Sequence, residues 1–325
     1  MKNASAGFSS VVKIMIIRPG ALGDTLMLAP SLAQVRLSEQ VLFVGRYPAI
    51  DFLKVYTEEC FNYEGPGWHG LFMEEPGEKI KPLIAKPSLV VAFLRDPEHR
   101  AAENLKLFFP GIPVHIFPPF PPEGEKKHVA LYLAECLQRA GCRVNPTEAL
   151  EKAVTVPLLE AKSTPSLKSS VVFHPGSGGK DKNYSLDFWV ELIMAFSENR
   201  LFSTKKKLLL LGPAEGSAYP LLKEKLGRKG VEFLLSPESE TLLSLLGSAT
   251  LYIGHDSGIT HLSAMLGTLT VALFRNTNVF RWRPLGPSVI VLQKQEGSGS
   301  LVREIVAKAR RSLSEPTNAP PACLT

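Results

Sequence analysis

The sequence contains few cysteines and no long apolar run. Its cysteines are Cys60, Cys136, Cys142 and Cys323, which form no C-x-x-C pair and no metal-ligand spacing. Cysteine usage of this kind is typical of reduced thiols and argues against a structural zinc site. No apolar run approaches the roughly 20 residues that span a bilayer, and Met1–Val12 lacks the charged start and apolar centre of a signal peptide. We therefore expect a cytoplasmic protein.

Acidic residues are in the minority. The chain has 37 Lys and Arg against 31 Asp and Glu, a formal net charge of +6. This excess suits an anionic substrate or a negatively charged membrane surface. No nucleic-acid-binding motif is present, so we expect no nucleic-acid partner. The 325 residues, 45% of them hydrophobic and 21% charged, are typical of a soluble protein with two domains.

Strand and helix patterns alternate in two successive halves of the chain, which predicts parallel sheets with helices on both faces. In the first half, the expected strands are Lys13–Arg18, Val41–Val44, Leu89–Leu94 and Val114–Phe117, and the expected helices follow the turn at Gly20–Asp24 and begin near Glu125. In the second half, the expected strands are Val171–Phe173, Lys207–Leu211, Val231–Leu234, Leu251–Ile253 and Thr270–Phe274, with helices between them and a last helix at Val302–Ser312.

The composition also predicts where the domains begin and end. A stretch rich in Pro, Ser, Thr and Lys between the halves is typical of a linker. We expect a flexible N-terminus (1–12), a first α/β domain (13–150), a linker (151–170), a second α/β domain (171–312) and a disordered tail (313–325).

The segment Leu251–Gly267 has the pattern of a phosphate-binding turn, because an apolar strand runs into a polar turn that opens a helix. Asp256 or Ser257 is a suitable N-cap, and Gly258 lets a ligand approach the first turn. Right-handed crossovers would place this turn beside HPGSGG and LGPAEG, on one edge of the second sheet. The alternative is an ordinary capped turn followed by a buried His261.

Four segments together resemble the ADP-heptose:lipopolysaccharide heptosyltransferases, glycosyltransferase family 9. They are RPGALGDTLMLAPSL (Arg18–Leu32), HPGSGGKDKNYSLDFWVEL (His174–Leu192), LLLLGPAEG (Leu208–Gly216) and GHDSGITHLSAMLGTLTVALF (Gly254–Phe274). The resemblance extends from about Lys13 to Arg310. It implies a GT-B fold, in which two Rossmann-like domains face each other across a cleft, the first binding the acceptor and the second the nucleotide sugar.

The first of these segments contains the expected catalytic base. Asp24 matches the catalytic aspartate of the family, and a carboxylate suits the removal of a proton from the acceptor hydroxyl. Gly20 and Gly23 would let donor and acceptor come close to the backbone. Alternatively, Asp24 simply caps the first helix. The turn is not G-x-G-x-x-G, which counts against a dinucleotide-binding dehydrogenase.

The second segment supplies positive charge for the leaving group. Lys182 matches the lysine of the family, which would stabilise the negative charge that builds on the departing diphosphate. Lys180 is the competing candidate, because the K-x-W pattern of the family is here K-N-Y, with Tyr184 in place of tryptophan. Ser177, Gly178 and Gly179 would add hydroxyl and backbone donors.

The remaining segments supply the expected donor site. Glu215 would accept hydrogen bonds from the nucleoside ribose, or is favoured only by a helix dipole. Asp256 would shape the turn, while the backbone of Ser257 and Gly258 binds the diphosphate. His261 is expected to support the helix rather than to catalyse.

Three arginines each have two alternative assignments. Arg275 stands where the family usually has a Gly-Pro-Thr turn, and it would contact the diphosphate or the sugar, or mark a different donor. Arg46 and Arg95 follow predicted strands of the first half and would meet an anionic acceptor, or are ordinary exposed residues.

The resemblance implies an inverting transferase that moves heptose from ADP-heptose to a lipopolysaccharide core or another lipid-linked saccharide, during transient association with the inner face of the cytoplasmic membrane. No D-x-D pair is placed to hold a divalent ion, so we expect no metal and no cofactor. The alternatives are a GT-B-like enzyme with another nucleotide sugar, such as a UDP-sugar transferase or epimerase, and a non-catalytic nucleotide-sugar-binding protein.

Overall fold

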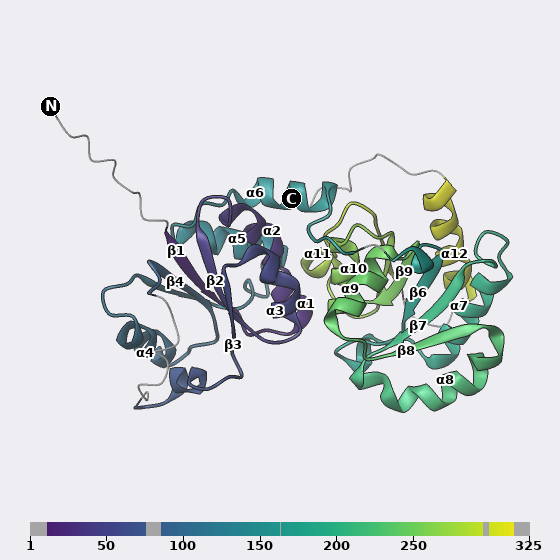
Figure 1. The fold of residues 1–325 in the computed structure, drawn as a ribbon, viewed down its shortest axis with the longest axis horizontal. Helices are drawn as coiled ribbons and strands as arrows, with labels where there is room; N and C mark the ends of the chain where they lie inside the picture. The colour runs from purple at the N-terminus through teal and green to yellow at the C-terminus, as the bar shows by residue number, and fades with distance from the viewer. Residues whose placement is uncertain (1–11, 76–85, 163, 295–298, 315–325) are drawn as a thin grey trace.

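A computed structural model describes residues 12–75, 86–162, 164–294 and 299–314 of the chain. They form two lobes, each built on a parallel sheet (Figure 1). The predicted flexible N-terminus falls almost entirely outside the described residues, as does all but the start of the predicted disordered tail, which includes Cys323.

The sheet of the N-terminal lobe has five strands in the order β3-β2-β1-β4-β5, all parallel. The strands are β1 (Lys13–Ile17), β2 (Gln40–Gly45), β3 (Glu59–Asn62), β4 (Leu89–Phe93) and β5 (Val114–Phe117). Every residue of β4 is buried, as expected for a strand covered on both faces. The helices of the N-terminal lobe are α1 (Leu22–Leu26), α2 (Ala29–Val35), α3 (Ala49–Leu53), α4 (Arg100–Phe108), α5 (Val129–Arg139) and α6 (Pro146–Thr155), with 3-10 turns η1 (Lys54–Tyr56) and η2 (Trp68–Phe72).

The sheet of the C-terminal lobe has six parallel strands in the order β11-β10-β9-β6-β7-β8. The strands are β6 (Ser170–His174), β7 (Lys206–Leu211), β8 (Val231–Leu235), β9 (Leu251–His255), β10 (Thr270–Phe274) and β11 (Val289–Gln293). Its helices are α7 (Leu186–Glu198), α8 (Tyr219–Leu226), α9 (Ser239–Ser248), α10 (Gly258–Met265), α11 (Val279–Trp282) and α12 (Gly299–Ser314), with 3-10 turns η4 (Pro165–Leu167), η5 (Lys180–Lys182), η6 (Pro213–Ala218) and η7 (Gly227–Lys229).

The alternating pattern predicted nine of these strands and missed the edge strands β3 and β11. Strand β3 is half-exposed and carries no alternation of apolar and polar residues, and β11 follows a proline-rich segment. The first predicted helix is divided into α1 and α2, with Pro30 near the start of the second. The stretch assigned to the linker begins with the end of α6, whose N-terminus is capped by Asn145.

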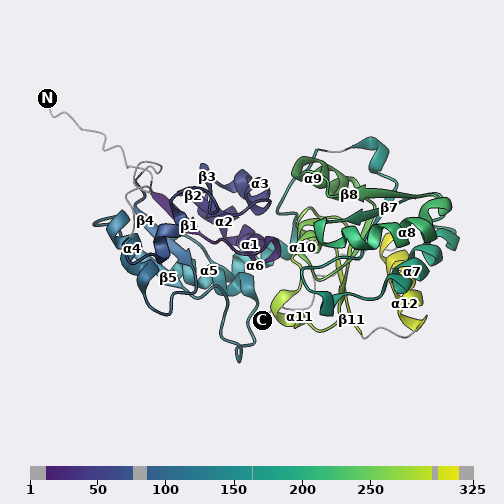
Figure 2. The same ribbon diagram turned by 90° about the horizontal axis from the view of Figure 1, so that it is seen from below.

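The two lobes contact each other through α1 and α10, which lie side by side in both views (Figures 1 and 2). A Cβ atom on Gly258 would lie 2.7 Å from Cβ of Leu22. Elsewhere the Asp51 carboxylate accepts a hydrogen bond from the Ser239 hydroxyl at 2.6 Å. Among the described residues, no helix combines the length and the apolar character that crossing a membrane requires.

Candidate active site

The carboxyl ends of five parallel strands bring the motif segments together. The turn RPGALGD follows β1 in the N-terminal lobe. In the C-terminal lobe, HPGSGG follows β6, GPAEG follows β7, DSG follows β9 and RNT follows β10. This is the edge at which ligands collect in open parallel sheets. The prediction that the motifs of the second half lie on one edge of their sheet is therefore confirmed.

Asp24 stands in the first turn of α1. The N-cap position belongs to Ala21, which makes no side-chain capping bond, while the backbone N–H of Ala21 donates to the Asp24 carboxylate. A Cβ atom on Gly20 would lie 3.1 Å from that of Asp24, so the glycine leaves room for the side chain. Burial raises the pKa of Asp24, and the nearby charges of Arg18, His261 and Lys182 oppose that increase. The carboxylate thus lies among cations from both lobes.

Arg18 is a buried cation that contacts the same turn, and the sequence patterns did not identify it. Its Nε donates to the main-chain oxygen of Asp24 at 2.9 Å, and its Nη1 donates to that of Pro119 at 2.9 Å. The guanidinium lies 5.5 Å from the ring centroid of Phe93 and 5.6 Å from that of Phe120. Burial lowers its pKa to about 10. Arg18 therefore fixes the backbone of the turn that carries Asp24.

Helix α10 opens as the sequence predicted. Ser257 is its N-cap, and the Ser257 hydroxyl accepts from the backbone N–H of Thr260 at 3.4 Å. The side chain of Asp256 contacts Lys182 and His261 instead, so it does not cap the helix. Below the turn, the Tyr252 hydroxyl lies 3.0 Å from Oγ1 of Thr260 and 3.0 Å from Nδ1 of His174. This buried chain of polar groups supports the first turn of the helix.

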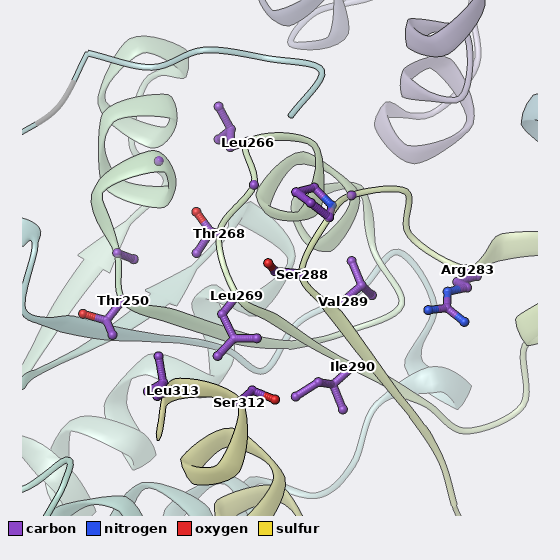
Figure 3. A pocket seen from close by; sticks show the side chains of 15 residues that line it. Thr250, Leu266, Thr268, Leu269, Arg283, Ser288, Val289, Ile290, Ser312 and Leu313 are labelled. Atoms are coloured by element: carbon purple, nitrogen blue, oxygen red, sulfur yellow. The ribbon is translucent and has the colours of Figure 1, made fainter. Parts of the chain in front are cut away.

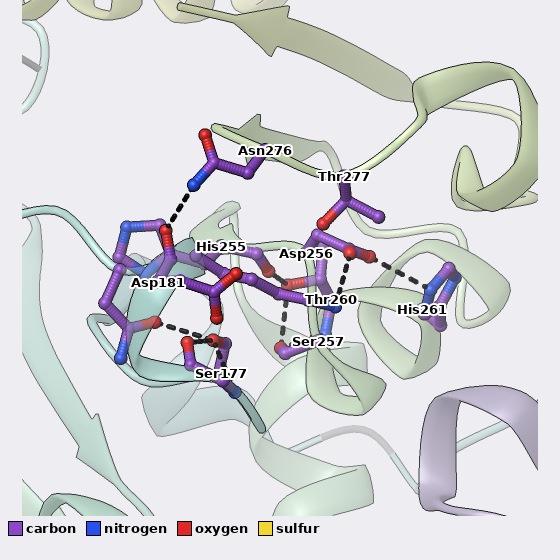
Figure 4. Close-up of polar contacts among 12 residues, drawn as sticks. Ser177, Asp181, His255, Asp256, Ser257, Thr260, His261, Asn276 and Thr277 are labelled. Atoms are coloured by element: carbon purple, nitrogen blue, oxygen red, sulfur yellow. Dashed lines mark hydrogen bonds and ion pairs between the residues drawn. The ribbon is translucent and has the colours of Figure 1, made fainter. Parts of the chain in front are cut away.

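Asp256 joins Lys182 to His261. Figure 4 shows its contact with His261. One carboxylate oxygen lies 3.0 Å from Nζ of Lys182, and the other lies 3.6 Å from Nε2 of His261. Asp256 is 5% exposed and His261 is 2% exposed. Burial alone would raise the pKa of Asp256, but the hydrogen bond and charge of His261, together with Lys182, lower it. The carboxylate is therefore held ionised.

The loop that carries Lys182 is fixed by His255, a buried residue that we did not predict. The backbone N–H of Tyr184 donates to Nε2 of His255 at 2.9 Å, which leaves Nδ1 to donate to the main-chain oxygen of Pro175 at 2.9 Å. Both ends of the loop are thereby bound to one imidazole. The sequence signal was a histidine between an apolar strand and the DSG turn.

Arg275 and Asn276, which follow β10, bind the same loop. Nη1 of Arg275 donates to the main-chain oxygen of Asn183 at 2.8 Å, and Nδ2 of Asn276 donates to that of Asp181 at 3.0 Å. Lys182 lies between these two carbonyls. Lys180 begins η5, and its side chain lies outside the part of the structure that is described.

Glu215 and Ser177 are engaged within the protein. Glu215 accepts from the backbone N–H of Gly212 at 2.8 Å and lies against Gly176, where a Cβ atom would be only 2.1 Å from its Cδ. The Ser177 hydroxyl lies 2.6 Å from Oδ1 of Asn183 and 2.8 Å from the main-chain oxygen of Gly179. Gly178 is exposed, with open space where a Cβ atom would be. The ribose and phosphate contacts of these residues stay predictions.

The glycines of the two turns serve the contact between the lobes. A Cβ atom on Gly23 would lie 3.2 Å from Cδ2 of His261, and one on Gly258 would lie 2.6 Å from Cγ of Leu22. The space that we expected Gly258 to leave for a ligand is thus occupied by α1 on this side. Asp24 is brought beside His261 as a result.

Arg46 and Arg95 follow β2 and β4 at the corresponding edge of the N-terminal sheet. Arg46 pairs with Glu64 at 3.4 Å, and both side chains are exposed. Arg95 lines a separate cavity of about 450 Å³ together with Asp96 and His99. Their expected contact with an acceptor stays a prediction.

A cavity of about 480 Å³ lies at the opposite edge of the C-terminal sheet (Figure 3). Thr250, Leu269 and Ser288, which line it, directly precede β9, β10 and β11. It is therefore distinct from the motif-bearing edge. Within the described ranges, no cluster of three or more His, Cys, Asp or Glu side chains is placed to hold a metal ion.

Comparisons with known proteins agree with this arrangement. A family model described as glycosyltransferase family 9 (heptosyltransferase) matches residues 145–308. No curated protein sequence matches the chain. Among solved structures, a family 9 glycosyltransferase from Veillonella parvula is similar over 94% of this chain and 98% of its own, with a TM-score of 0.68 and 16% identity.

Two Escherichia coli structures are similar as well. Heptosyltransferase WaaC with ADP has a TM-score of 0.67 and 15% identity over 92% of this chain and 100% of its own. ADP-heptose LPS heptosyltransferase II has a TM-score of 0.66 and 17% identity over 94% of this chain and 100% of its own. The two parallel sheets and these likenesses confirm the predicted GT-B fold.

Proposed function

Because the chain belongs to glycosyltransferase family 9, the heptosyltransferases, we propose that it transfers heptose from ADP-heptose to a saccharide acceptor with inversion at the anomeric carbon. The chain is a glycosyltransferase of this family; the donor, the acceptor and the stereochemistry are the proposal. One observation carries it: Gly23, the neighbour of Asp24 in the N-terminal lobe, lies so close to His261 of the C-terminal lobe that a Cβ atom on it would be 3.2 Å from Cδ2 of that ring. In keeping with this contact, the charges of His261 and Lys182 lower the pKa of the Asp24 carboxyl group.

In the proposed reaction, Asp24 removes the proton from the acceptor hydroxyl as that oxygen attacks the anomeric carbon. The raised pKa of Asp24 suits a general base, because a stronger base accepts the proton more readily. Attack on the face opposite to the leaving diphosphate inverts the configuration. A single displacement requires no covalent glycosyl intermediate, so one carboxylate is sufficient.

Lys182 and the N-terminus of α10 stabilise the leaving group in this proposal. Negative charge builds on the diphosphate as the glycosyl bond breaks, and a nearby ammonium group favours the transition state over the ground state. Backbone N–H groups of Ser257 and Gly258 would add the usual donors of a helix N-terminus. Because these groups already supply positive charge, we propose that transfer proceeds without a divalent metal.

The donor and the acceptor are proposed from the relatives. Related structures are described as WaaC with ADP and WaaC with ADP-2-deoxy-2-fluoro heptose, which supports an ADP-sugar donor. We propose a lipid-linked acceptor such as a lipopolysaccharide core, bound by the N-terminal lobe at the inner face of the cytoplasmic membrane. The net charge of +6 suits an anionic surface.

Calorimetric titration of the purified protein with ADP, UDP and GDP tests the donor class. We expect ADP to bind at least tenfold more tightly than the other two. Tighter binding of UDP would instead support a UDP-sugar transferase or an epimerase.

A transfer assay with ADP-heptose and a truncated lipopolysaccharide acceptor, with and without EDTA, tests the reaction. We expect product with an inverted anomeric centre, at equal rates in both conditions. Retention of configuration, or loss of activity with EDTA, would contradict the corresponding part of the proposal. Nucleotide binding without turnover on any acceptor of a panel would favour a non-catalytic protein.

A further inference from the structure

The two main-chain carbonyls that flank Lys182 are both bound by side chains from the segment after β10. Asn276 Nδ2 donates to the oxygen of Asp181 at 3.0 Å (Figure 4), and Arg275 Nη1 donates to the oxygen of Asn183 at 2.8 Å. The two donors are adjacent in sequence and follow directly on the last residue of the buried strand β10. A rigid part of the sheet thus fixes the backbone immediately before and after one lysine.

This double attachment matters because of the nature of the lysine side chain. Lysine has a long flexible chain that loses much conformational entropy when its ammonium group is held in one place. The side chain of Lys182 is 35% exposed, and Nζ has one ion-pair partner among the described residues, Asp256 at 3.0 Å. Attachment of the backbone on both sides restricts the position from which the side chain extends.

We propose that Arg275 and Asn276 are positioning residues for Lys182, holding the 175–184 loop so that the ammonium group meets both Asp256 and the diphosphate of the donor. The inference rests on the proposed function for the role of the diphosphate. The geometric part of the inference is that the Lys182–Asp256 pair depends on Arg275 and Asn276. This part rests on the hydrogen bonds alone. The guanidinium of Arg275 acts here on a protein carbonyl rather than on the donor.

A double-mutant cycle distinguishes positioning from direct contact with the donor. Arg275→Ala and Asn276→Ala are each combined with Lys182→Ala, and the affinity for ADP is measured by calorimetry. In the background with Lys182, we expect each substitution to weaken binding about tenfold. In the Lys182→Ala background, we expect each to change binding less than twofold, because its effect passes through the lysine.

Two results would overturn the inference. An equal loss of ADP affinity in both backgrounds would mean that Arg275 or Asn276 binds the nucleotide itself. No loss of affinity in either background would mean that these two residues do not position Lys182. Arg303→Ala removes an exposed arginine of α12 and serves as the matched control. Thermal melting of every variant verifies folding, and Arg275→Lys is the fallback if Arg275→Ala does not fold.

A second measurement needs no nucleotide. Reductive ¹³C-methylation labels the lysines, and Lys182→Arg identifies the NMR signal of Lys182. We expect this signal to move in Asp256→Asn, and to move in the same direction in Arg275→Ala and Asn276→Ala. An unchanged signal in the last two variants contradicts positioning, even if ADP binds. A shifted signal in a protein that does not bind ADP contradicts the proposed function and leaves the positioning role intact.

Discussion

Gly258 at the start of α10 approaches Gly23 of α1 so closely that a Cβ atom on Gly258 would lie 2.9 Å from the backbone nitrogen of Gly23. A real Cβ atom does not tolerate such a distance from backbone. The two glycines therefore allow direct contact between the lobes beside Asp24 and His261. Because of this contact, the position of Asp24 relative to the start of α10 depends on backbone packing rather than on long side chains.

Gly258→Ala is expected to separate the lobes and to reduce transfer by about a hundredfold, because a displacement of roughly 1 Å costs that much in an oriented reaction. Steady-state transfer rates and the radius of gyration from small-angle scattering measure the two effects. Gly124→Ala is the control, because its Cβ atom meets open space. Wild-type rates in Gly258→Ala would show that the contact between the lobes is unimportant for turnover.

Much of the fold follows from the sequence because parallel strands buried on both faces form continuous apolar runs. Val171–Phe173 and Leu251–Ile253 are fully buried parts of β6 and β9, and both were predicted. The missed strand β3 lacks this signal, because none of its residues is buried. The edge strands β5 and β8 were predicted, so an edge position alone does not hide a strand.

The candidate site was predicted in part, for a related reason. Ser257 caps α10 through a contact three residues away, which a local pattern detects. The attachment of Arg275 to Asn183 joins residues 92 positions apart, and the approach of Gly23 to His261 joins two lobes. Such contacts depend on the assembled fold. The sequence thus predicted the cap of α10 but not which distant residues hold one another.

Asp24→Asn is expected to abolish transfer and to leave ADP affinity within about twofold, since the amide cannot accept the proton. The pKa of Asp24 is raised above its ordinary value of 3.8, mainly by burial. In the wild type, kcat/KM should therefore fall as the pH falls through a value above 3.8. Undiminished turnover by Asp24→Asn at neutral pH would contradict its role as the base.

The same substitution carries a prediction for stability. A carboxyl group with a raised pKa in the folded state contributes stability that is present at low pH and lost as the pH rises through that pKa. Asp24→Asn should therefore melt at a higher temperature than the wild type at pH 7, and at the same temperature at pH 3. A lower melting temperature at pH 7 would contradict this account.

Asp256→Asn is expected to lower the free energy of unfolding at pH 7 by about 1–3 kcal/mol, because it removes the partner of Lys182 and of the buried His261. The pKa of Asp256 is lowered from 3.8, so the stabilisation is present above that value and is lost as the pH falls through the lowered pKa. Urea titrations at pH 7 and pH 3 measure the difference.

Asp187→Asn is the matched control, because Asp187 is 80% exposed and pairs with Lys225 at the surface. We expect this control to change the free energy of unfolding by less than about 1 kcal/mol. Equal destabilisation by Asp187→Asn and Asp256→Asn would mean that the buried pairings of Asp256 add nothing.

His128 links the lobes in its neutral form. Its Nδ1 accepts from the backbone N–H of Ala130 at 3.2 Å and caps α5, and its Nε2 donates to the main-chain oxygen of Arg283 at 2.9 Å. Complete burial, together with the charges of His261 and Arg283, lowers its pKa from 6.5 to about 4. Between these pH values the unfolded chain takes up a proton that the folded protein does not, so stability should fall as the pH falls from 6.5 toward 4.

His128→Asn tests this pH dependence, because asparagine is also a good N-cap but does not titrate. We expect the variant to be less stable than the wild type at pH 7, where the bond to Arg283 is lost, and to lose less stability between pH 6.5 and pH 4. Between pH 6.5 and pH 4, the free energy of unfolding of the variant should fall by about 3 kcal/mol less than that of the wild type. Urea titrations at several pH values measure it, with His69→Asn, which removes an exposed histidine, as the control. Identical slopes for His128→Asn and the wild type would mean that His128 titrates alike in the folded and unfolded chains.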